Sequence, residues 1–488
     1  MAITSFYFLC FFVICLILYY LIPAKWQWKF LLLVSLLYYL IVNEPWLVCY
    51  PVFTIITTYA GALGIERMKE QKAKRLILSS VVLSNLAGLA LIKYFHIGVN
   101  LGVPLGISFY TFSMIGYLFD VYYEIGKAEH NVGKISLFGI MFTNMVSGPI
   151  MRYDRMKSSL LSGHTFSYEN VTKGCQRILW GFFEKLVISE RIALPVNTVF
   201  SAYADYHGAA VLFAVFGYTV QLYTDFAGCM DIVLGAAQAF GIILPENFKT
   251  PFFSKSIQEF WRRWHITLGE WLKDYLFYPL LRTLFFMELP GRLKQTFGKK
   301  TAKKITSYSA MLILWFAVGL WHGGAWHYII GVGLLQWFYI VSGELLTPFW
   351  KYLKRVLHVK EESYAFCAFQ RIRTFILMSL SFLLFRADGL HSAYAVFMQI
   401  FRPGDRGEIM NLGLDYIELI ILIVSIFIFF TVSLCKECLE EGDTVRDRIA
   451  NKKLIIRWII WIGLLFYCIL LGQYGPGYSA SEFIYQGF

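Results

Sequence analysis

The sequence predicts an all-α integral membrane protein with roughly ten to twelve spanning helices. Of its 488 residues, 58% are hydrophobic and only 16% are charged, whereas about a quarter of the residues in a soluble domain are charged. Apolar stretches long enough to cross about 30 Å of hydrocarbon recur along the chain, and such a stretch satisfies its own backbone hydrogen bonds as a helix. These stretches cover residues 1–24, 45–65, 76–92, 305–343, 412–433 and 454–472.

The first stretches set the expected orientation. Residues 1–24 contain no basic n-region, and the first lysine, Lys25, follows the apolar stretch. We therefore expect no cleaved signal peptide. The net charge is +12, but the basic residues lie in short clusters between apolar runs. This pattern is typical of topology signals and not of a nucleic-acid partner. By the positive-inside rule both termini are expected outside the cell, and the clusters expected inside are residues 66–75, 282–304, 351–373 and 445–457.

The central third of the chain, residues 94–290, is interrupted by Gly, Pro and charged residues. At membrane depth such interruptions are tolerated only where protein or a water-filled cavity surrounds the backbone. We therefore expect re-entrant or interfacial helices and a buried site in this third. The sequence shows no repeat and no long soluble segment, so residues 1–488 are expected to form a single membrane domain.

Residues 259–275, EFWRRWHITLGEWLKDY, predict one amphipathic helix. Trp261, Trp264 and His265 share an apolar face at helical spacing, and the charged side chains gather on the other face. The helix could lie flat at the interface with Trp and Arg as anchors. Alternatively, it could be a re-entrant helix that brings His265 towards a polar cavity.

A histidine stands near the middle of the longest uncharged stretch. Residues 305–343 contain no Asp, Glu, Lys or Arg, and Gly323 and Gly324 predict a break between two helices. His322 directly precedes this break. An ionisable side chain at that depth is costly and is a functional candidate by default; the alternative is a neutral histidine that hydrogen-bonds between helices. His327, beside a helix start, is more typical of a structural residue.

The nine cysteines are scattered, most of them in apolar segments, so we expect no disulfide framework. Cys435 and Cys438 form a C-x-x-C pair. Without a second pair or nearby histidines, this pair predicts no metal site.

Two deep histidines with neither an acidic partner nor a metal-ligand set suit proton transfer better than metal-assisted hydrolysis. A neutral imidazole can deprotonate an attacking hydroxyl near neutral pH. Acyl transfer from a thioester to an alcohol needs such a base and a stabilised oxyanion. These residues alone do not name that reaction.

A series of motifs, in order along most of the chain, resembles the membrane-bound O-acyltransferase family and specifically its alginate O-acetyltransferase branch. The resemblance implies a ring of tilted helices around a central tunnel that leads to His322, the match to the catalytic histidine of the W-H-G motif. His265 matches the second functional histidine of the family. The motifs are PLGISFYTF at 104–112, QLYTDFAG at 221–228, LPENF at 244–248, FWRRWH at 260–265, LKDYL at 272–276, GLWHG at 319–323 and LFRAD at 384–388.

The resemblance also implies the direction of transfer. An acyl group, expected to be acetyl, would pass from a cytoplasmic thioester to hydroxyls of an extracellular polysaccharide or cell-wall polymer. The expected donor is acetyl-CoA, used as a co-substrate and not bound permanently, and the expected partners are an extracytoplasmic transferase of the serine-hydrolase type and membrane lipid. Where the family often has P-L-G-G, residues 279–282 read PLLR. The same motifs fit the related D-alanine branch, which takes its acyl group from a carrier protein and transfers it to teichoic acid.

Two other classes of protein remain open from the sequence. A polytopic transporter would also use broken helices and deep polar residues, although the internal repeat typical of that class is absent. A purely structural subunit of a membrane assembly is the third alternative. Acyl chemistry that depends on His322 distinguishes both from an acyltransferase.

The C-terminal tail, residues 481–488, carries the last candidate. The positive-inside rule places it outside, after a glycine-rich stalk at 472–477. Its ending F-I-Y-x-x-F resembles a C-terminal motif of the alginate branch in which the tyrosine is implicated as an acyl relay, so Tyr485 is expected to carry the acyl group briefly. A phenyl ester is more activated than an alkyl ester, so a serine on a partner could accept the group. The alternative is that these aromatic residues only anchor the tail at the interface.

Overall fold

A computed structural model describes residues 2–94, 104–145, 148–440 and 442–475. In these ranges every regular element is a helix, apart from one isolated bridge between Phe248 and Trp264, and the all-α prediction is confirmed. Nine of the described helices are long and apolar enough to cross a membrane. The sequence suggested roughly ten to twelve. Part of the difference is that α1 (Phe6–Leu21) and α5 (Ile107–Tyr122) have only 16 residues each.

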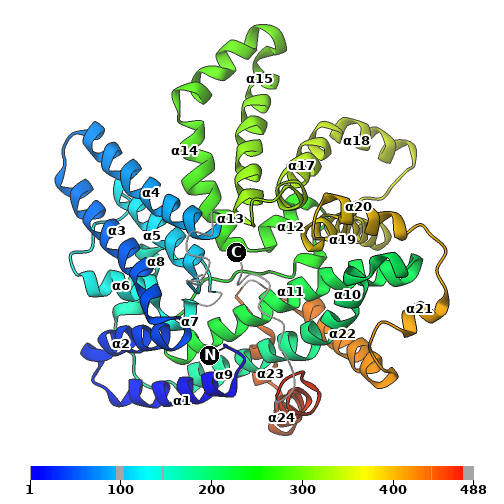
Figure 1. The fold of residues 1–488 in the computed structure, drawn as a ribbon, viewed down its shortest axis with the longest axis horizontal. Helices are drawn as coiled ribbons and strands as arrows, with labels where there is room; N and C mark the ends of the chain where they lie inside the picture. Colours follow the sequence, from blue (N-terminus) through cyan, green and yellow to red (C-terminus); the bar gives the residue numbers. More distant parts are fainter. Residues whose placement is uncertain (1, 95–103, 146–147, 441, 476–488) are drawn as a thin grey trace.

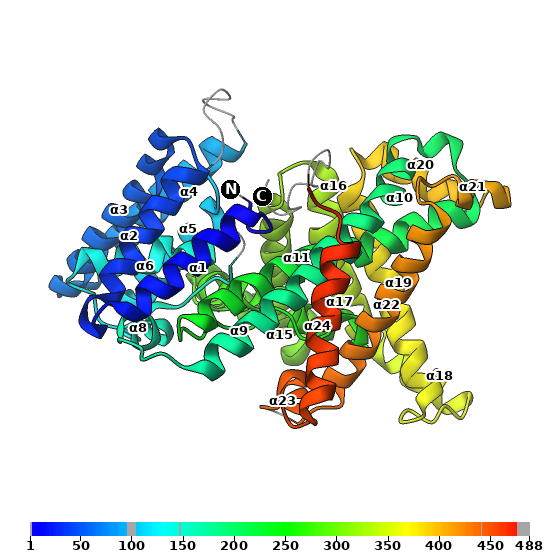
Figure 2. The same ribbon diagram turned by 90° about the horizontal axis from the view of Figure 1, so that it is seen from below.

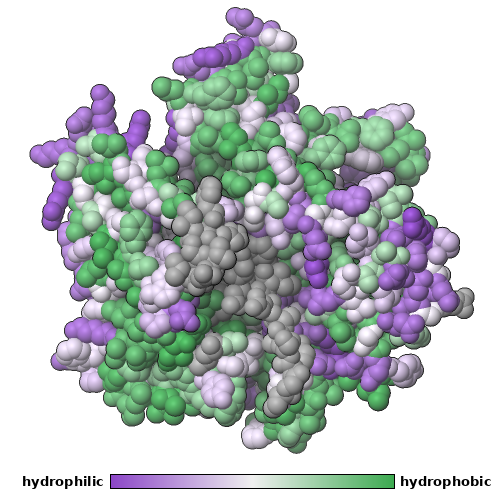
Figure 3. Space-filling view, in the orientation of Figure 1, coloured by the Kyte–Doolittle hydropathy of each residue, from purple (hydrophilic) through white to green (hydrophobic). Residues whose placement is uncertain are grey.

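The helices form a ring around a common centre, where α12 and α13 lie (Figure 1). Apolar side chains cover much of the visible rim, as expected for a surface in contact with lipid (Figure 3). The N-terminal sector of the ring consists of α1, α2 (Ala24–Val42), α3 (Cys49–Arg67), α4 (Gln71–Lys93), α5, α6 (Val132–Ile140), α7 (Phe142–Met145) and α8 (Tyr153–Leu161).

Two helices cross the middle of the molecule in close contact. α9 (Tyr168–Phe182) packs along α11 (Gly208–Ala239), whose membrane-spanning window is 72% buried. A Cβ atom added at Gly181 would lie 2.5 Å from the backbone oxygen of Gly228, so glycine permits this approach, as small residues do between membrane helices. α9 continues through the π-helix η3 (Phe183–Ser189) into α10 (Glu190–Ser201).

The elements that carry the candidate site follow α11. The basic cluster at 282–304, expected between two spanning helices, is itself largely helical: α15 begins at Leu284 and bends at Gly298, which has a φ of 75°. Two helical segments meet there and form the arm at the top of Figure 1. The elements in order are α12 (Ile257–Arg263), α13 (Ile266–Leu272), the π-helix η6 (Lys273–Phe277), α14 (Tyr278–Leu281), α15 (Leu284–Trp321), α16 (Trp326–Tyr328), the π-helix η7 (Ile329–Leu334) and α17 (Leu335–Leu345).

The C-terminal helices close the ring. Figure 2 shows α18 and α23 projecting from one edge of the molecule, whereas α20 and α21 lie at the opposite edge. Both α18 and α23 belong to predicted basic clusters. The helices are α18 (Thr347–Val356), α19 (Tyr364–Arg386), α20 (Leu390–Gln399), α21 (Arg406–Met410), α22 (Tyr416–Glu437), α23 (Val445–Ala450) and α24 (Leu454–Leu471).

Candidate active site

His322 directly follows the last residue of α15 and is its C-terminal cap. Its N–H donates to the Val318 oxygen at 3.2 Å, and the chain then turns through Gly323 and Gly324, which have φ values of 147° and 74°. A side chain at either position would be strained. The predicted break between two helices is therefore confirmed, and it leaves the side chain of His322 buried, with 4% of its surface exposed.

Aromatic rings surround the His322 imidazole. The Trp321 ring lies 4.5 Å away between centroids, and the Phe385 ring meets the imidazole edge-on at 5.3 Å. The Tyr328 ring in turn packs against that of Phe385, with the centroids 5.2 Å apart. Phe385 lies on α19, in the LFRAD motif, so two motifs that are far apart in sequence meet at this histidine.

His265 interrupts the helix that the periodicity predicts. α12 ends at Arg263, His265 has φ 47° and ψ 52°, and α13 begins at Ile266. The prediction of one continuous helix was wrong because a neighbouring strand-like segment competes for its hydrogen bonds: the N–H of Ile266 donates to the backbone oxygen of Asn247 at 3.0 Å. A left-handed conformation is uncommon for a residue with a side chain, and it tends to occur at functional sites.

The side chain of His265 points into the protein, with 3% of the residue exposed. Its Nδ1 lies 3.3 Å from Oδ1 of Asn247, and the same oxygen accepts hydrogen bonds from Thr267 N and Oγ1 at 3.1 and 2.9 Å. Because the Thr267 N–H can only donate, that Asn247 atom is an acceptor and His265 Nδ1 must carry the hydrogen. In the neutral ring, Nε2 is then the basic nitrogen.

The indole of Trp321 lies against both histidines. Its ring centroid is 6.1 Å from that of His265 and 4.5 Å from that of His322. Phe226, on α11, meets His265 edge-on at 5.0 Å. The structure thus brings the two sequence-predicted histidines to one aromatic wall, which is the indole of Trp321. Tyr485, the third predicted site residue, lies outside the described residues.

Residues 6–291 match the model of the membrane-bound O-acyltransferase (MBOAT) family. The chain belongs to this family. It is a multi-pass membrane protein and an O-acyltransferase. The matched range includes His265 and ends before His322.

Curated relatives of this MBOAT protein act on different polymers. The probable alginate O-acetylase AlgI of Pseudomonas syringae pv. tomato is 28% identical over 84% of this chain and 77% of its own length. The peptidoglycan O-acetyltransferase of Helicobacter pylori is 28% identical over 77% of this chain and 73% of its own length. The teichoic acid D-alanyltransferase of Bacillus subtilis is 32% identical over 47% of this chain and 56% of its own length.

The MBOAT chain also buries a group of charges that the sequence analysis did not single out. Lys185 on η3 forms ion pairs with Glu190, at 2.7 Å, and with Asp225 of the QLYTDFAG motif. All three residues are at most 4% exposed. Charges at membrane depth are normally paired in this way, so the group fixes η3 against α11 beside the site. The sequence signal that could have revealed this group is the set of charged residues at 184–191 in an otherwise apolar segment.

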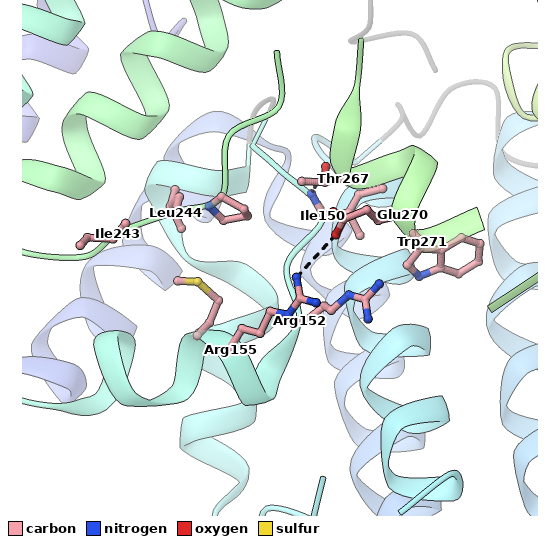
Figure 4. Close-up of a pocket in the computed structure, with 10 residues that line it drawn as sticks. Ile150, Arg152, Arg155, Ile243, Leu244, Thr267, Glu270 and Trp271 are labelled. Carbon is pink, nitrogen blue, oxygen red and sulfur yellow. Dashed lines mark hydrogen bonds and ion pairs between the residues drawn. The ribbon is translucent and has the colours of Figure 1, made fainter. Parts of the chain in front are cut away.

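A cavity of about 220 Å³ lies beside the His265 segment of the MBOAT fold (Figure 4). Its arginines are balanced by carboxylates: Arg155 lies 3.6 Å from Glu270, and Arg152 pairs with Asp274. Thr267 connects the cavity to the histidine, because its Oγ1 accepts from the Ile150 N–H at 3.0 Å and donates to Asn247. The lining residues are Ile150, Arg152, Arg155, Met156, Ile243, Leu244, Pro245, Thr267, Glu270 and Trp271.

Potential metal ligands are dispersed in this MBOAT structure. Within the described ranges no group of three or more His, Cys, Asp or Glu side chains is arranged to hold a metal ion. All nine cysteines carry free thiols, and both Cys435 and Cys438 are exposed.

Proposed function

We propose that this acyltransferase moves an acetyl group from a cytoplasmic thioester to hydroxyls of an extracellular polysaccharide or cell-wall polymer, with His322 as the general base. The observation that carries the proposal is the pair of buried histidines on the Trp321 wall, one of them presented at the end of a broken membrane helix. Neutral imidazoles in such surroundings can accept a proton from an alcohol.

The proposed step is the attack of the acceptor hydroxyl on the thioester. The acceptor hydroxyl oxygen bonds to the thioester carbonyl carbon while His322 takes the hydroxyl proton. The carbon–sulfur bond then breaks, and the proton held by His322 goes to the departing thiolate. The products are an oxygen ester and a free thiol, and no redox partner is required.

His265 is assigned a positioning role in this proposal. Its Nδ1–H is fixed by Asn247 and its backbone is held by the break between α12 and α13. The imidazole therefore has a defined orientation beside Trp321. A group held in this way can orient the thioester or the attacking hydroxyl.

The cavity beside Thr267 is the proposed approach for the donor. It joins cationic side chains, Arg152 and Arg155, to a floor that is hydrogen-bonded to the His265 partner Asn247. Coenzyme A and an acyl carrier protein both present a phosphopantetheine thioester, and arginine is a preferred partner of phosphate. In the proposed complex the phosphate would compete with Asp274 and Glu270 for Arg152 and Arg155. The residues PLLR at 279–282 replace the usual P-L-G-G of the family without lining this cavity.

We also propose that residues 1–488 act as one membrane domain with both termini outside. Helices from both halves of the chain surround the same centre in Figure 1. The basic helices α18 and α23 share one edge in Figure 2, which supports a common cytoplasmic side. α24 starts beside α23 and crosses from there, so the chain after Leu471 would emerge where an extracytoplasmic transferase could receive the acyl group.

The relay on Tyr485 remains part of this proposal, supported by the sequence pattern of the tail. Tyr485→Phe keeps the aromatic anchor and removes only the hydroxyl nucleophile. We expect polymer acetylation to fall and the acylated C-terminal peptide, detected by mass spectrometry in cells without the downstream transferase, to disappear. Unchanged acetylation, with no acylated peptide in the unsubstituted protein, would favour direct transfer.

The donor can be tested with purified protein in liposomes. Acetyl-CoA and a D-alanyl carrier protein are offered separately, and the release of free thiol is compared between the unsubstituted protein and His322→Ala. We expect His322-dependent release from acetyl-CoA. Release only from the carrier protein would support D-alanyl transfer, as in the Bacillus subtilis relative, and solute transport without thiol release would support a transporter.

A further inference from the structure

A lysine from α4 reaches the end of α15 that presents His322. Lys93 is the last residue of α4, and its Nζ donates a hydrogen bond to the backbone oxygen of Trp321. The ammonium group lies 5.2 Å from the centroid of the Trp321 ring, at cation–π distance. The sequence analysis did not single out this residue, because its contact with Trp321 spans 228 positions.

The C-terminal end of a helix is electrostatically unfavourable for a histidine that must act as a base. The last carbonyl groups of a helix have no intrahelical partner and together act as a negative partial charge. A histidine there is favoured in its protonated form, which cannot accept a proton. His322 directly follows the last residue of the 38-residue helix α15, so this bias acts against the role of general base.

We propose that Lys93 is a positioning residue for acyl transfer, which caps the carbonyl end of α15 and keeps His322 in its neutral, basic form. The proposal rests on the proposed function of His322. The Lys93 ammonium satisfies one of the terminal carbonyls and places a positive charge against Trp321, the residue before His322. A positive charge there opposes a second positive charge on the imidazole.

Among the described residues, the other side chains around this end of α15 do not replace the positive charge of Lys93. Tyr94, which directly follows α4, donates a hydrogen bond from its hydroxyl to the Leu320 oxygen at 2.6 Å, at the same helix end but without a charge. His265 approaches from the break before α13, and Tyr328 approaches from α16. α19 turns the uncharged Phe385 towards the imidazole. Its neighbour Arg386 donates to Asn197 at 2.8 Å, and Asp388 follows it.

The test is the pH dependence of acetyl transfer by full-length protein in liposomes, measured from pH 5.5 to 9. In Lys93→Met, the acid side of the profile should move to higher pH, because an imidazole that binds protons more tightly is inactive over a wider range. We expect the loss to be largest at pH 5.5 and to become smaller as the pH rises towards 8.5. Lys93→Arg retains the charge and should retain the profile.

Tyr94→Phe is the matched control, since it removes a neutral hydrogen bond from the same helix end. Any loss in this variant should be the same factor at every pH. An unshifted profile in Lys93→Met, or an equal shift in Tyr94→Phe, would overturn the role of the charge. Lys93→Gln, which also lacks the charge, provides the comparison if the methionine variant does not accumulate. Full activity in His322→Ala would instead refute the proposed function itself.

Discussion

At the scale of single residues, the site depends on side chains whose orientation is set by partners distant in sequence. His265 is the clearest case: Asn247, 18 positions earlier, fixes its Nδ1 hydrogen, and Asn247 is itself held by Thr267. This arrangement explains why a residue with a side chain tolerates a left-handed backbone at that point. The strain is offset by the buried hydrogen bonds that Asn247 Oδ1 accepts from His265 and Thr267.

Asn247→Ala should therefore impair catalysis more than it impairs folding. The substitution removes the acceptor shared by His265 and Thr267 and leaves the imidazole without a defined tautomer. We expect kcat/KM for acetyl transfer to fall by about 10- to 100-fold, corresponding to the loss of one or two buried hydrogen bonds. Thr267→Val, which removes only one donor to that oxygen, is the control and should lose less. An Asn247→Ala protein with unchanged kinetics would contradict this arrangement.

The sequence revealed the site residues that are unusual for their depth, and it missed those that are unusual only for their contacts. His322 stands out in a 39-residue uncharged run, and His265 stands in an ordered motif. Asn247 belongs to a quoted motif, but nothing in one sequence shows that its amide meets His265. Lys93 ends an apolar stretch, where a lysine is ordinarily an interfacial anchor.

At the scale of elements, the apolar stretches predicted several of the spanning helices, whereas hydrophobic periodicity failed at the break in 259–275. The periodic face is real, because Trp264, Leu268 and Leu272 are all buried. Periodicity could not show that segment 247–249 would take hydrogen bonds from the middle of the helix, with Lys249 N donating to the Arg263 oxygen at 2.9 Å. Tertiary hydrogen bonding outweighed local propensity there.

Close packing of α9 on α11 gives a prediction at this scale. In Gly181→Ala, the new Cβ would lie 2.5 Å from the Gly228 oxygen, so the two helices must separate. We expect a loss of about 1–3 kcal/mol of stability, seen as a lower Tm in detergent.

Gly463→Ala on α24 is the matched control. Its added methyl group meets no atom of the described structure within 4 Å, so Tm should be unchanged or slightly higher. Equal effects of the two substitutions would show that α9 and α11 do not pack through their glycines.

At the scale of the whole molecule, composition and the positions of the apolar stretches were sufficient to predict the class of fold. They were not sufficient for the arrangement of residues 94–290. Helices such as α5 in this region are too short for a spanning window and are buried by neighbours instead. Their place is decided by long-range contacts that apolar length does not encode.

The proposed orientation can be tested by cysteine labelling of intact cells. Lys72→Cys and Lys299→Cys, both at exposed positions in predicted cytoplasmic clusters, should resist a membrane-impermeant maleimide until the cells are opened. Asp205→Cys, exposed in the short helix η4 (Tyr203–Asp205) that follows α10, should label from outside. The reverse pattern would require the donor cavity and the acceptor side to be exchanged.

The most direct test of the central claim is acetyl transfer by His322→Ala in liposomes at protein amounts matched to the unsubstituted enzyme. Removing the general base should reduce the rate by about 10²- to 10⁴-fold while the protein remains folded in the membrane. His327→Ala, five positions further along the chain, should keep most of the activity. Near-normal transfer by His322→Ala would contradict the account.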